Sequence, residues 1–202
     1  MSLLPAVHPF IQELLADGPV VTDGAWGTEL QKRGLALGEF PDAWNLTHRE
    51  RVAEVARAYV AAGSHIILTN TFGANRLRLA EAGLADQVVP INRKGVEISR
   101  LAAGDRACVF ALIGPSGKML LNGDVTADEL RAAFDEQAEA LADAGADALV
   151  VETMADLAEA EEAVKAARAT GLPVVVCLVF DSGKNKDRTM MGATPEQAAA
   201  AL

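Results

Sequence analysis

Two carboxylates in this sequence stand where a run of apolar residues ends, and that position favours ligand binding. Residues 146–153 read Ala-Asp-Ala-Leu-Val-Val-Glu-Thr, so Glu152 closes a stretch that is typical of a strand buried on both faces. Asp23 follows the apolar residues 20–22 in the same way. A carboxylate that leaves water unpaired costs several kcal/mol, roughly. Each acid is therefore expected either to pair with a cation of the protein or to supply negative charge to a ligand.

The elements that must position these acids alternate along the chain. The expected strands are short apolar stretches at residues 20–22, 65–69, 107–113, 146–153 and 173–180. The segments between them show helical spacing, and Thr-x-x-Glu capping boxes at Thr47 and Thr126 predict where two of the helices begin. Residues 59–71 and 141–153 form a weak repeat of helix end, turn and strand, so the repeating unit is a strand plus a helix.

This alternation implies an α/β fold with a parallel sheet and right-handed crossovers. We expect a (β/α)8 TIM barrel, of which about five βα units are present in this chain, and an open doubly wound sheet is the alternative. No Gly-x-Gly-x-x-Gly motif follows the first expected strand, which argues against the dinucleotide-binding version of that sheet.

In either architecture ligands bind at the carboxyl ends of the strands. The candidate site is therefore made by Asp23-Gly24, Asn70-Thr71-Phe72, Pro115-Ser116, Glu152-Thr153 and the loop after Phe180. Two carboxylates among hydroxyl and amide groups would suit a ligand that carries an ammonium group. Structural explanations stay open: Asp23 could belong to a plain turn, Asn70 and Thr71 could satisfy loop backbone, and Glu152 could form a structural ion pair.

Composition excludes several classes of partner. The net charge of −10 and the lack of a basic run make nucleic acid and anionic membrane poor partners. The longest apolar stretch, residues 173–180, is far shorter than a membrane-spanning helix, and no leader-like segment opens the chain, so we expect a cytoplasmic protein. Cys108 and Cys177 both lie in strand-like apolar runs and are expected to be buried free thiols.

Five blocks of sequence, taken together and in order, resemble a known family. They are Asp23-Gly-Ala-Trp-Gly-Thr-Glu-Leu30, Asn45-Leu-Thr47, Ala62-Gly-Ser-His-Ile-Ile-Leu-Thr-Asn-Thr-Phe72, Ile113-Gly-Pro-Ser-Gly117 and Val151-Glu-Thr153. The family is the homocysteine S-methyltransferase domain, as found in cobalamin-dependent methionine synthase and in the betaine and S-methylmethionine enzymes. The resemblance runs from about Val20 to Leu202.

The resemblance implies an eight-unit barrel that holds homocysteine at its top face and serves methionine biosynthesis. By motif position Asp23 and Gly24 would hold the amino acid end of homocysteine, and Glu152 would accept from its ammonium group. Trp44 resembles the aromatic residue that packs near the substrates in the betaine branch, although a plain loop anchor is the alternative. The substrate-binding residues implied in this way are Asp23, Gly24, Trp44, Asn70, Thr71, Phe72 and Glu152.

The family's zinc site is where this sequence departs from the resemblance. Its three cysteine ligands lie on later strands, and the chain contains none of those segments. Cys108 and Cys177 match no ligand position, so we expect neither a metal site nor catalytic residues in this chain, which alone should be inactive. Because five strands cannot close an eight-stranded barrel, residues 1–202 are expected to form the amino-terminal part of one homocysteine-binding domain.

Alternatives and open questions follow from these limits. The chain could be a non-catalytic half-barrel that binds or scaffolds, or a TIM-barrel enzyme of other chemistry. The sequence leaves open the methyl donor, a small molecule or a corrinoid, and it permits a homo-oligomer. The polar loop at residues 181–192 could be a lid over the donor, but a solvated loop is the simpler interpretation.

Overall fold

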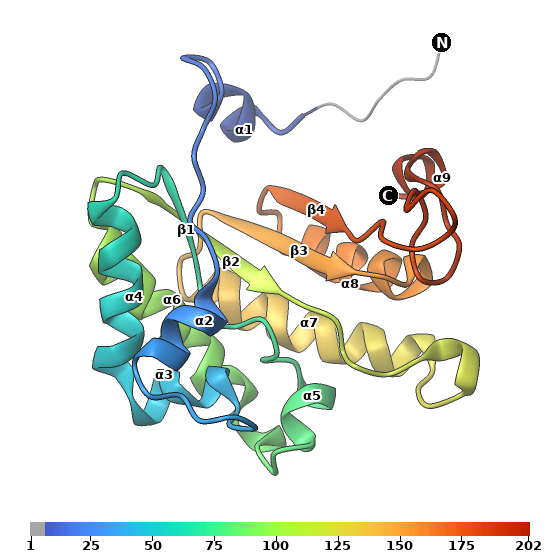
Figure 1. The fold of residues 1–202 in the computed structure, drawn as a ribbon, viewed down its shortest axis with the longest axis horizontal. Helices are drawn as coiled ribbons and strands as arrows, with labels where there is room; N and C mark the ends of the chain where they lie inside the picture. Colours follow the sequence, from blue (N-terminus) through green and yellow to red (C-terminus); the bar gives the residue numbers. More distant parts are fainter. Residues whose placement is uncertain (1–6) are drawn as a thin grey trace.

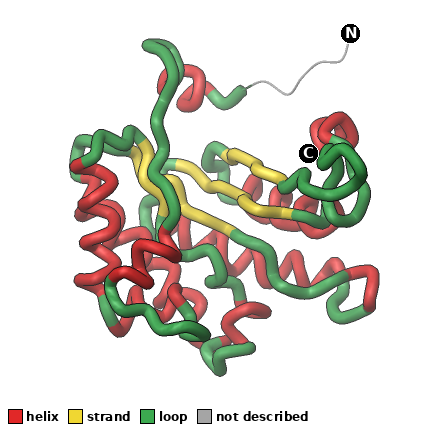
Figure 2. The backbone as a smooth tube through the Cα atoms, viewed as in Figure 1, coloured by secondary structure: helices red, strands yellow, loops and turns green. Residues whose placement is uncertain are grey.

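The protein is built on a parallel sheet of four strands, seen in a computed structural model that describes residues 7–202 (Figures 1 and 2). In sheet order the strands are β1 (Ile66–Leu68), β2 (Cys108–Ile113), β3 (Ala148–Met154) and β4 (Val174–Leu178). All three pairings are parallel, with Ile66 opposite Cys108, Phe110 opposite Ala148 and Val150 opposite Val175. The predicted α/β fold with a parallel sheet is therefore confirmed.

The first expected strand is much reduced. Residues 20–22 contribute a single parallel bridge between Thr22 and Ile66 rather than a strand. Two backbone bonds flank that bridge, from His65 N to Val21 O at 2.8 Å and from Asp23 N to Ile66 O at 2.9 Å. This segment therefore still runs beside β1, and it brings Asp23 to the carboxyl end of the sheet.

Long helices pack along one face of the sheet (Figure 1). They are α4 (Arg49–Ala61), α6 (Val88–Ala103), α7 (Ala127–Asp143) and α8 (Leu157–Ala169). The shorter helical segments are α1 (Pro9–Leu14), α2 (Trp26–Lys32), η1 (Pro41–Ala43), α3 (Trp44–Thr47), α5 (Arg76–Ala80), η2 (Ala85–Gln87), η3 (Leu120–Asn122) and α9 (Pro195–Ala201). Between residues 7 and 202 no helix combines the length and the apolar character needed to cross a bilayer.

The capping boxes give one correct and one wrong prediction. At Thr126 the hydroxyl accepts from Glu129 N and the Glu129 carboxylate accepts from Thr126 N, as expected. The box at Thr47 does not form, because Thr47 is the last residue of α3 and its hydroxyl donates to Ala43 O at 3.2 Å. Helix α4 instead begins after His48, without a side-chain cap.

The two faces of the sheet have different partners because successive side chains of a strand point to opposite sides. In β2, Val109, Ala111 and Ile113 are buried against the helices. Cys108, Phe110 and Leu112 point to the other face, where they join a second apolar cluster with residues of β1 and β3. Helix α1 packs onto that cluster, and the Phe10 and Phe110 ring centroids lie 6.2 Å apart.

Candidate functional site

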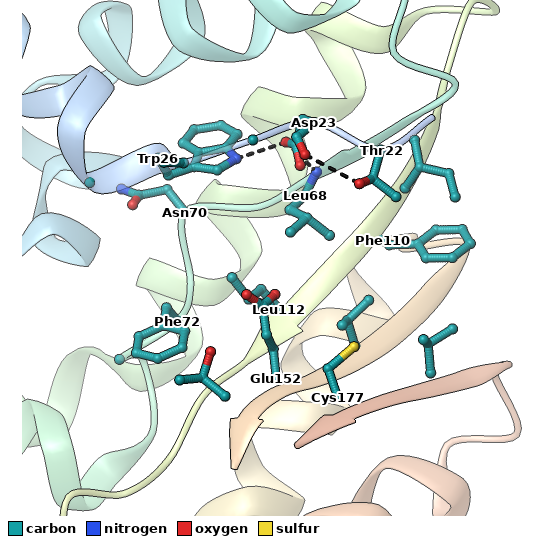
Figure 3. Close-up of a pocket in the computed structure, with 18 of the residues that line it drawn as sticks. Thr22, Asp23, Trp26, Leu68, Asn70, Phe72, Phe110, Leu112, Glu152 and Cys177 are labelled. Atoms are coloured by element: carbon teal, nitrogen blue, oxygen red, sulfur yellow. Dashed lines mark hydrogen bonds between the residues drawn. The ribbon is translucent and has the colours of Figure 1, made fainter. Parts of the chain in front are cut away.

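A cavity of about 1110 Å³ lies on the face of the sheet that the long helices do not cover (Figure 3). Its floor is apolar and includes Phe110, Val150 and Val175. Its upper wall is formed by strand ends and the loops that follow them, where the polar groups gather. Of the residues predicted to bind substrate, those that line this cavity are Asp23, Gly24, Asn70, Phe72 and Glu152.

Asp23 is held at the cavity wall by two donors. Trp26 Nε1 and the backbone N of Leu68 both donate to Asp23 Oδ2 at 2.8 Å (Figure 3). The other oxygen, Oδ1, is buried and has no hydrogen-bond partner among the described residues. Burial raises the pKa of Asp23 to about 6, with a further rise from the charge of Glu152, against the lowering effect of the two hydrogen bonds. Asp23 therefore does more than form a plain turn: its Oδ2 binds Trp26 and β1, and its carboxylate lies at the cavity wall with Oδ1 unpaired among the described residues.

Glu152 reaches the cavity through a local irregularity in β3. Ala148, Val150 and Glu152 alternate onto the cavity face, while Leu149 and Val151 pack against helices. Continued alternation would point Met154 into the cavity. Instead the pairing with β4 is irregular between Val151 and Met154, and Met154 is buried on the helix side.

Thr153 is the residue that makes this change of direction. Its φ of 63° lies in the left-handed region, which a β-branched residue rarely adopts. Thr153 also lines the cavity, directly after Glu152 in the chain. Burial raises the pKa of Glu152, and the adjacent Thr153 side chain lowers it in part. The strand end is thus shaped around Glu152, a feature that alternation alone does not predict.

Neither carboxylate has a cationic partner within the described part of the chain. None of the ion pairs among residues 7–202 includes Asp23 or Glu152. The structural ion pair that was an alternative for Glu152 is therefore absent from these residues. Two acids that raise each other's cost of ionisation form a site of negative potential, and such a site is suited to an ammonium group.

The predicted residues in the loop after β1 differ in whether they line the cavity. Phe72 lines the cavity, and its ring and carbonyl lie so close to Gly114 that a Cβ there would meet them at 2.6 Å. Asn70 also lines the cavity, but its Nδ2 already donates to Pro41 O at 2.8 Å and to Asn45 Oδ1 at 3.0 Å. Thr71 is fully buried, and its hydroxyl donates to Leu112 O at 2.7 Å. The side chain of Thr71 therefore supports the loop backbone and lies outside the cavity.

Trp44 is likewise placed away from the cavity. It is 3% exposed and stacks on His48 with ring centroids 4.5 Å apart, while the Arg51 guanidinium lies 5.4 Å from its ring. Its neighbours belong to the core between α2, α4 and β1. The loop-anchor interpretation fits this position, because the short helix α3 turns the indole toward that core. The aromatic residue of the same segment that lines the cavity is Phe40.

Several polar residues of the cavity wall were not predicted from the sequence, and three of them have contacts that bear on the site. Arg78 comes from α5, and helical arginines give no signal of function. Asp42 is fully buried in η1, accepts from Gly73 N at 2.9 Å, and has its pKa raised to about 7 by that burial. Trp26, which could have been a packing residue, holds Asp23 through its indole N–H. The Pro-Asp pair before an aromatic residue was the one local signal that could have drawn attention to Asp42.

The expectation of two buried thiols is wrong. Cys177 is exposed and lines the cavity, and Cys108 is only half-buried. Alternation explains the difference, because Val174, Val176 and Leu178 take the helix side of β4 and leave Cys177 on the cavity face. Partial desolvation by its neighbours on the cavity face raises the pKa of the Cys177 thiol although the residue is exposed, and the nearby charge of Glu152 adds to this. Both effects favour the neutral thiol.

The remaining strand-end loops contribute less than expected. Ser116 is fully buried, and its backbone N donates to Glu159 Oε1 at 2.7 Å, so this loop is tied to α8. Neither Pro115 nor Ser116 lines the cavity. After β4 the cavity wall includes Val179, but none of the residues 181–192. The solvated-loop interpretation of that segment agrees with this placement.

The described residues do not fit a three-thiolate metal site. No group of three or more His, Cys, Asp or Glu side chains within residues 7–202 could hold a metal ion. The two cysteines stand at different levels of the sheet, since Cys108 is the first residue of β2 and Cys177 is close to the end of β4. A tetrahedral zinc site would need a further thiolate or imidazole beside each of them.

Comparison with known proteins gives consistent matches. A family model described as "Homocysteine S-methyltransferase" matches residues 20–202. The methionine synthase of Mycobacterium leprae is 33% identical over 168 residues, which are 77% of this chain and 14% of that protein. The betaine–homocysteine S-methyltransferase 1 of Sus scrofa is 29% identical over 205 residues, covering 95% of this chain and 69% of that protein.

Solved structures agree with these sequence matches. The metallated form of the homocysteine methyltransferase MmuM from Escherichia coli superposes with a TM-score of 0.78 at 25% identity. The superposition covers 95% of this chain and 73% of that one. The chain thus spans only a part of the relatives that it matches, from 14% of the bacterial methionine synthase to about three quarters of MmuM.

Proposed function

The chain belongs to the homocysteine S-methyltransferase family, and from this premise we propose that it supplies the amino acid site of an enzyme that methylates homocysteine to methionine. The observation that carries the proposal is the pair of carboxylates, Asp23 and Glu152, that face one cavity without a cationic partner among the described residues. An aminothiol with a protonated amine supplies the missing positive charge.

The two acids act on the ammonium group in complementary ways. Asp23 supplies its carboxylate at the cavity wall, where Trp26 and Leu68 fix it through Oδ2 and where the buried Oδ1 has no partner among the described residues. Glu152 approaches from the carboxyl end of β3, where the left-handed backbone of Thr153 changes the direction of the strand. Hydrogen bonds to a charged partner contribute about 1.5–3 kcal/mol each. Because both groups are preorganised, little of that energy is spent on ordering them when the ligand binds.

The apolar part of the cavity suits the rest of the ligand. Leu68, Leu112 and Phe72 line the space next to the two acids. Such a wall can cover the methylene groups of homocysteine and keep water from the sulfur. Methyl transfer then requires an in-line approach of the donor carbon to that sulfur, so the positioning of the amino acid end contributes directly to the reaction.

Activation of the sulfur lies outside these residues. A free thiol has a pKa near 8.5, so little thiolate is present at neutral pH. The family resemblance implies that a zinc ion bound by three cysteines would bind the substrate sulfur and keep it deprotonated. MmuM has been solved in a metallated form. Because residues 7–202 do not provide a matching set of ligands, we assign no step of the reaction to a metal held by them.

We propose further that the chain is the amino-terminal part of a single TIM-barrel domain. Four parallel strands and the bridged segment at residues 20–22 correspond to about five units of the eight. The match to 73% of MmuM supports this assignment. The methyl donor is proposed to be a small molecule or a corrinoid, since the relatives include a betaine enzyme and methionine synthases.

The substitution Glu152→Gln tests the proposal. It removes the charge at the end of β3 and keeps the shape, so we expect homocysteine affinity to fall by roughly 1–3 kcal/mol, which is about 5- to 150-fold. Isothermal titration with L-homocysteine measures it. Glu97→Gln is the matched control, because Glu97 pairs with Lys94 on the surface of α6 and should leave the affinity unchanged. An affinity that does not respond to Glu152→Gln would remove Glu152 from the site.

A further inference from the structure

The charges around the cavity are strongly unequal. Within the described chain the acidic and basic side chains that line it are Asp23, Glu39, Asp42, Glu152 and Arg78, so four carboxyl groups face one cation. The acids account for binding of an ammonium group. They would repel a carboxylate, however, and an amino acid carries both groups. The cavity therefore needs one place where negative charge is accepted, and Arg78 is the residue that can provide it.

The guanidinium of Arg78 is held in position by its surroundings. It lies 5.8 Å from the centroid of the Phe40 ring, in cation–π contact with a residue that also lines the cavity. Its Nη1 would stand 3.1 Å from a Cβ built on Gly117, and its Cγ would stand 3.4 Å from a Cβ built on Gly73. Two glycines thus leave the space that the arginine occupies between the loops after β1 and β2.

One edge of this guanidinium is free. Arg78 Nη1 donates to Glu81 Oε2 at 2.7 Å, and Glu81 is shared with Lys118, whose Nζ lies 2.9 Å from Oε1. Nε and Nη2 of Arg78 have no acceptor among residues 7–202, whereas the side chain as a whole is 43% exposed. These two nitrogens form the edge that binds a carboxylate with two parallel hydrogen bonds.

On the same helix, Arg76 already binds a carboxylate of the protein with the same two nitrogens. Arg76 donates from Nε to Glu136 Oε2 at 2.7 Å and from Nη2 to Glu136 Oε1 at 2.5 Å. Arg76 does not line the cavity. The two arginines stand two positions apart on α5. Arg76 has its carboxylate within the protein, whereas Arg78 lines the cavity and its Nε and Nη2 have no acceptor among residues 7–202.

We propose that Arg78 is the carboxylate-binding residue of this cavity, through its Nε and Nη2. The ligand class is a small carboxylate, and the source is either the α-carboxylate of the amino acid or a carboxylate of the methyl donor. Asp42 is fully buried and accepts from Gly73 N; burial raises its pKa to about 7, and the charge of Arg78 lowers it only in part. Asp42 makes no hydrogen bond to Arg78 in the described structure, so the Nε and Nη2 edge stays without an acceptor there. The identity of the ligand rests on the proposed function, whereas the anion site does not.

Two thiols that differ only by the carboxylate show whether Arg78 binds the α-carboxylate of the amino acid. Isothermal titration of the 202-residue chain would compare L-homocysteine with 3-aminopropane-1-thiol, which keeps the amine and the thiol. We expect Arg78→Gln to weaken homocysteine binding about tenfold and to leave the decarboxylated thiol unchanged, with Arg78→Lys in between. Arg76→Gln is the matched control and should change neither affinity. Equal weakening toward both thiols would show a structural role and overturn the proposal.

A second titration tests the methyl donor as the source of the carboxylate and uses betaine as the probe. If Arg78→Gln leaves homocysteine affinity unchanged and lowers that of betaine, the carboxylate comes from the donor, and the proposal stands. If neither homocysteine nor betaine responds, Arg78 binds no ligand carboxylate.

An experiment without homocysteine separates this inference from the proposed function. In the 15N-labelled chain, the Arg78 Nε–Hε signal is assigned by its loss in Arg78→Gln and is then followed during titration with acetate. A saturating shift at Arg78, absent at Arg76, supports the anion site even if the wild-type protein fails to bind homocysteine. No shift with acetate overturns it.

Discussion

The two ends of β3 carry acids that are treated in opposite ways. Asp147 directly precedes the strand, and both of its oxygens are used, one by Arg100 Nη2 and the other by Val109 N at 2.7 Å. Glu152 lies near the carboxyl end of the strand and has no cationic partner among the described residues, where Asp23 Oδ1 is also unbonded. At the amino end the protein neutralises its own charge. At the carboxyl end it leaves charge for a ligand, and this difference distinguishes a structural acid from a binding one.

The most sensitive way to test this contrast is the pH dependence of stability. The pKa of Asp23 rises from 3.8 to about 6 on folding, so the folded protein holds this proton more tightly than the unfolded chain. Stability contributed by Asp23 is therefore present below about pH 4 and is lost as the pH rises through about 6, by up to about 3 kcal/mol. Asp23→Asn removes this loss.

Urea unfolding of wild type and Asp23→Asn at several pH values between 4 and 7 measures it. As the pH rises, the free energy of unfolding of the variant should increase relative to that of wild type. If the difference between the two free energies did not change with pH, the Asp23 carboxylate would be stabilised by the protein as Asp147 is, and the contrast between the two ends of β3 would be wrong. Homocysteine affinity should move the other way in wild type and fall below about pH 6, because a protonated Asp23 no longer attracts an ammonium group.

Removal of the structural acid should cost stability without affecting the site. Asp147→Ala leaves the buried N–H of Val109 without its acceptor and Arg100 without its ion pair, so we expect a loss of about 2 kcal/mol. Asp143→Ala is the control, since its pair with Arg93 is exposed on both sides and should contribute less than about 1 kcal/mol. Chemical denaturation measures both. A loss of homocysteine affinity in Asp147→Ala with the fold intact would contradict the assignment of separate roles.

The smallest effect is expected at the turn that aims Glu152. Thr153→Gly relaxes a φ of 63° and should raise stability by about 1 kcal/mol, while it loosens Glu152 and weakens homocysteine binding a few-fold. Lys186→Gly relaxes a similar φ of 54° in the loop after β4, and it should raise stability with no change in affinity. If both variants kept full affinity, the conformation of Thr153 would have no part in positioning Glu152.

Particular residues show how far sequence reasoning reached. Asp23 and Glu152 were predicted because each follows an apolar run, and the structure places both on one cavity. Trp44 was assigned to the site by motif, and Thr71 both by its position at a strand end and by motif, yet their side chains are buried elsewhere. A motif specifies which residues come in succession, but the direction of each side chain depends on neighbours distant in sequence, such as Leu112 for Thr71 and helix α6 for Trp44.

The sequence by itself determined the α/β class, the parallel sheet and the position of the two acids at strand ends, because these follow from local apolar patterns and from the alternation of strands and helices. Only the tertiary structure decided that Asp23 Oδ1 lacks a partner within residues 7–202, that Cys177 faces the cavity and that Arg78 stands at its wall. The physical reason is that burial, hydrogen-bond satisfaction and charge balance are properties of groups brought together by folding, and no single segment contains them.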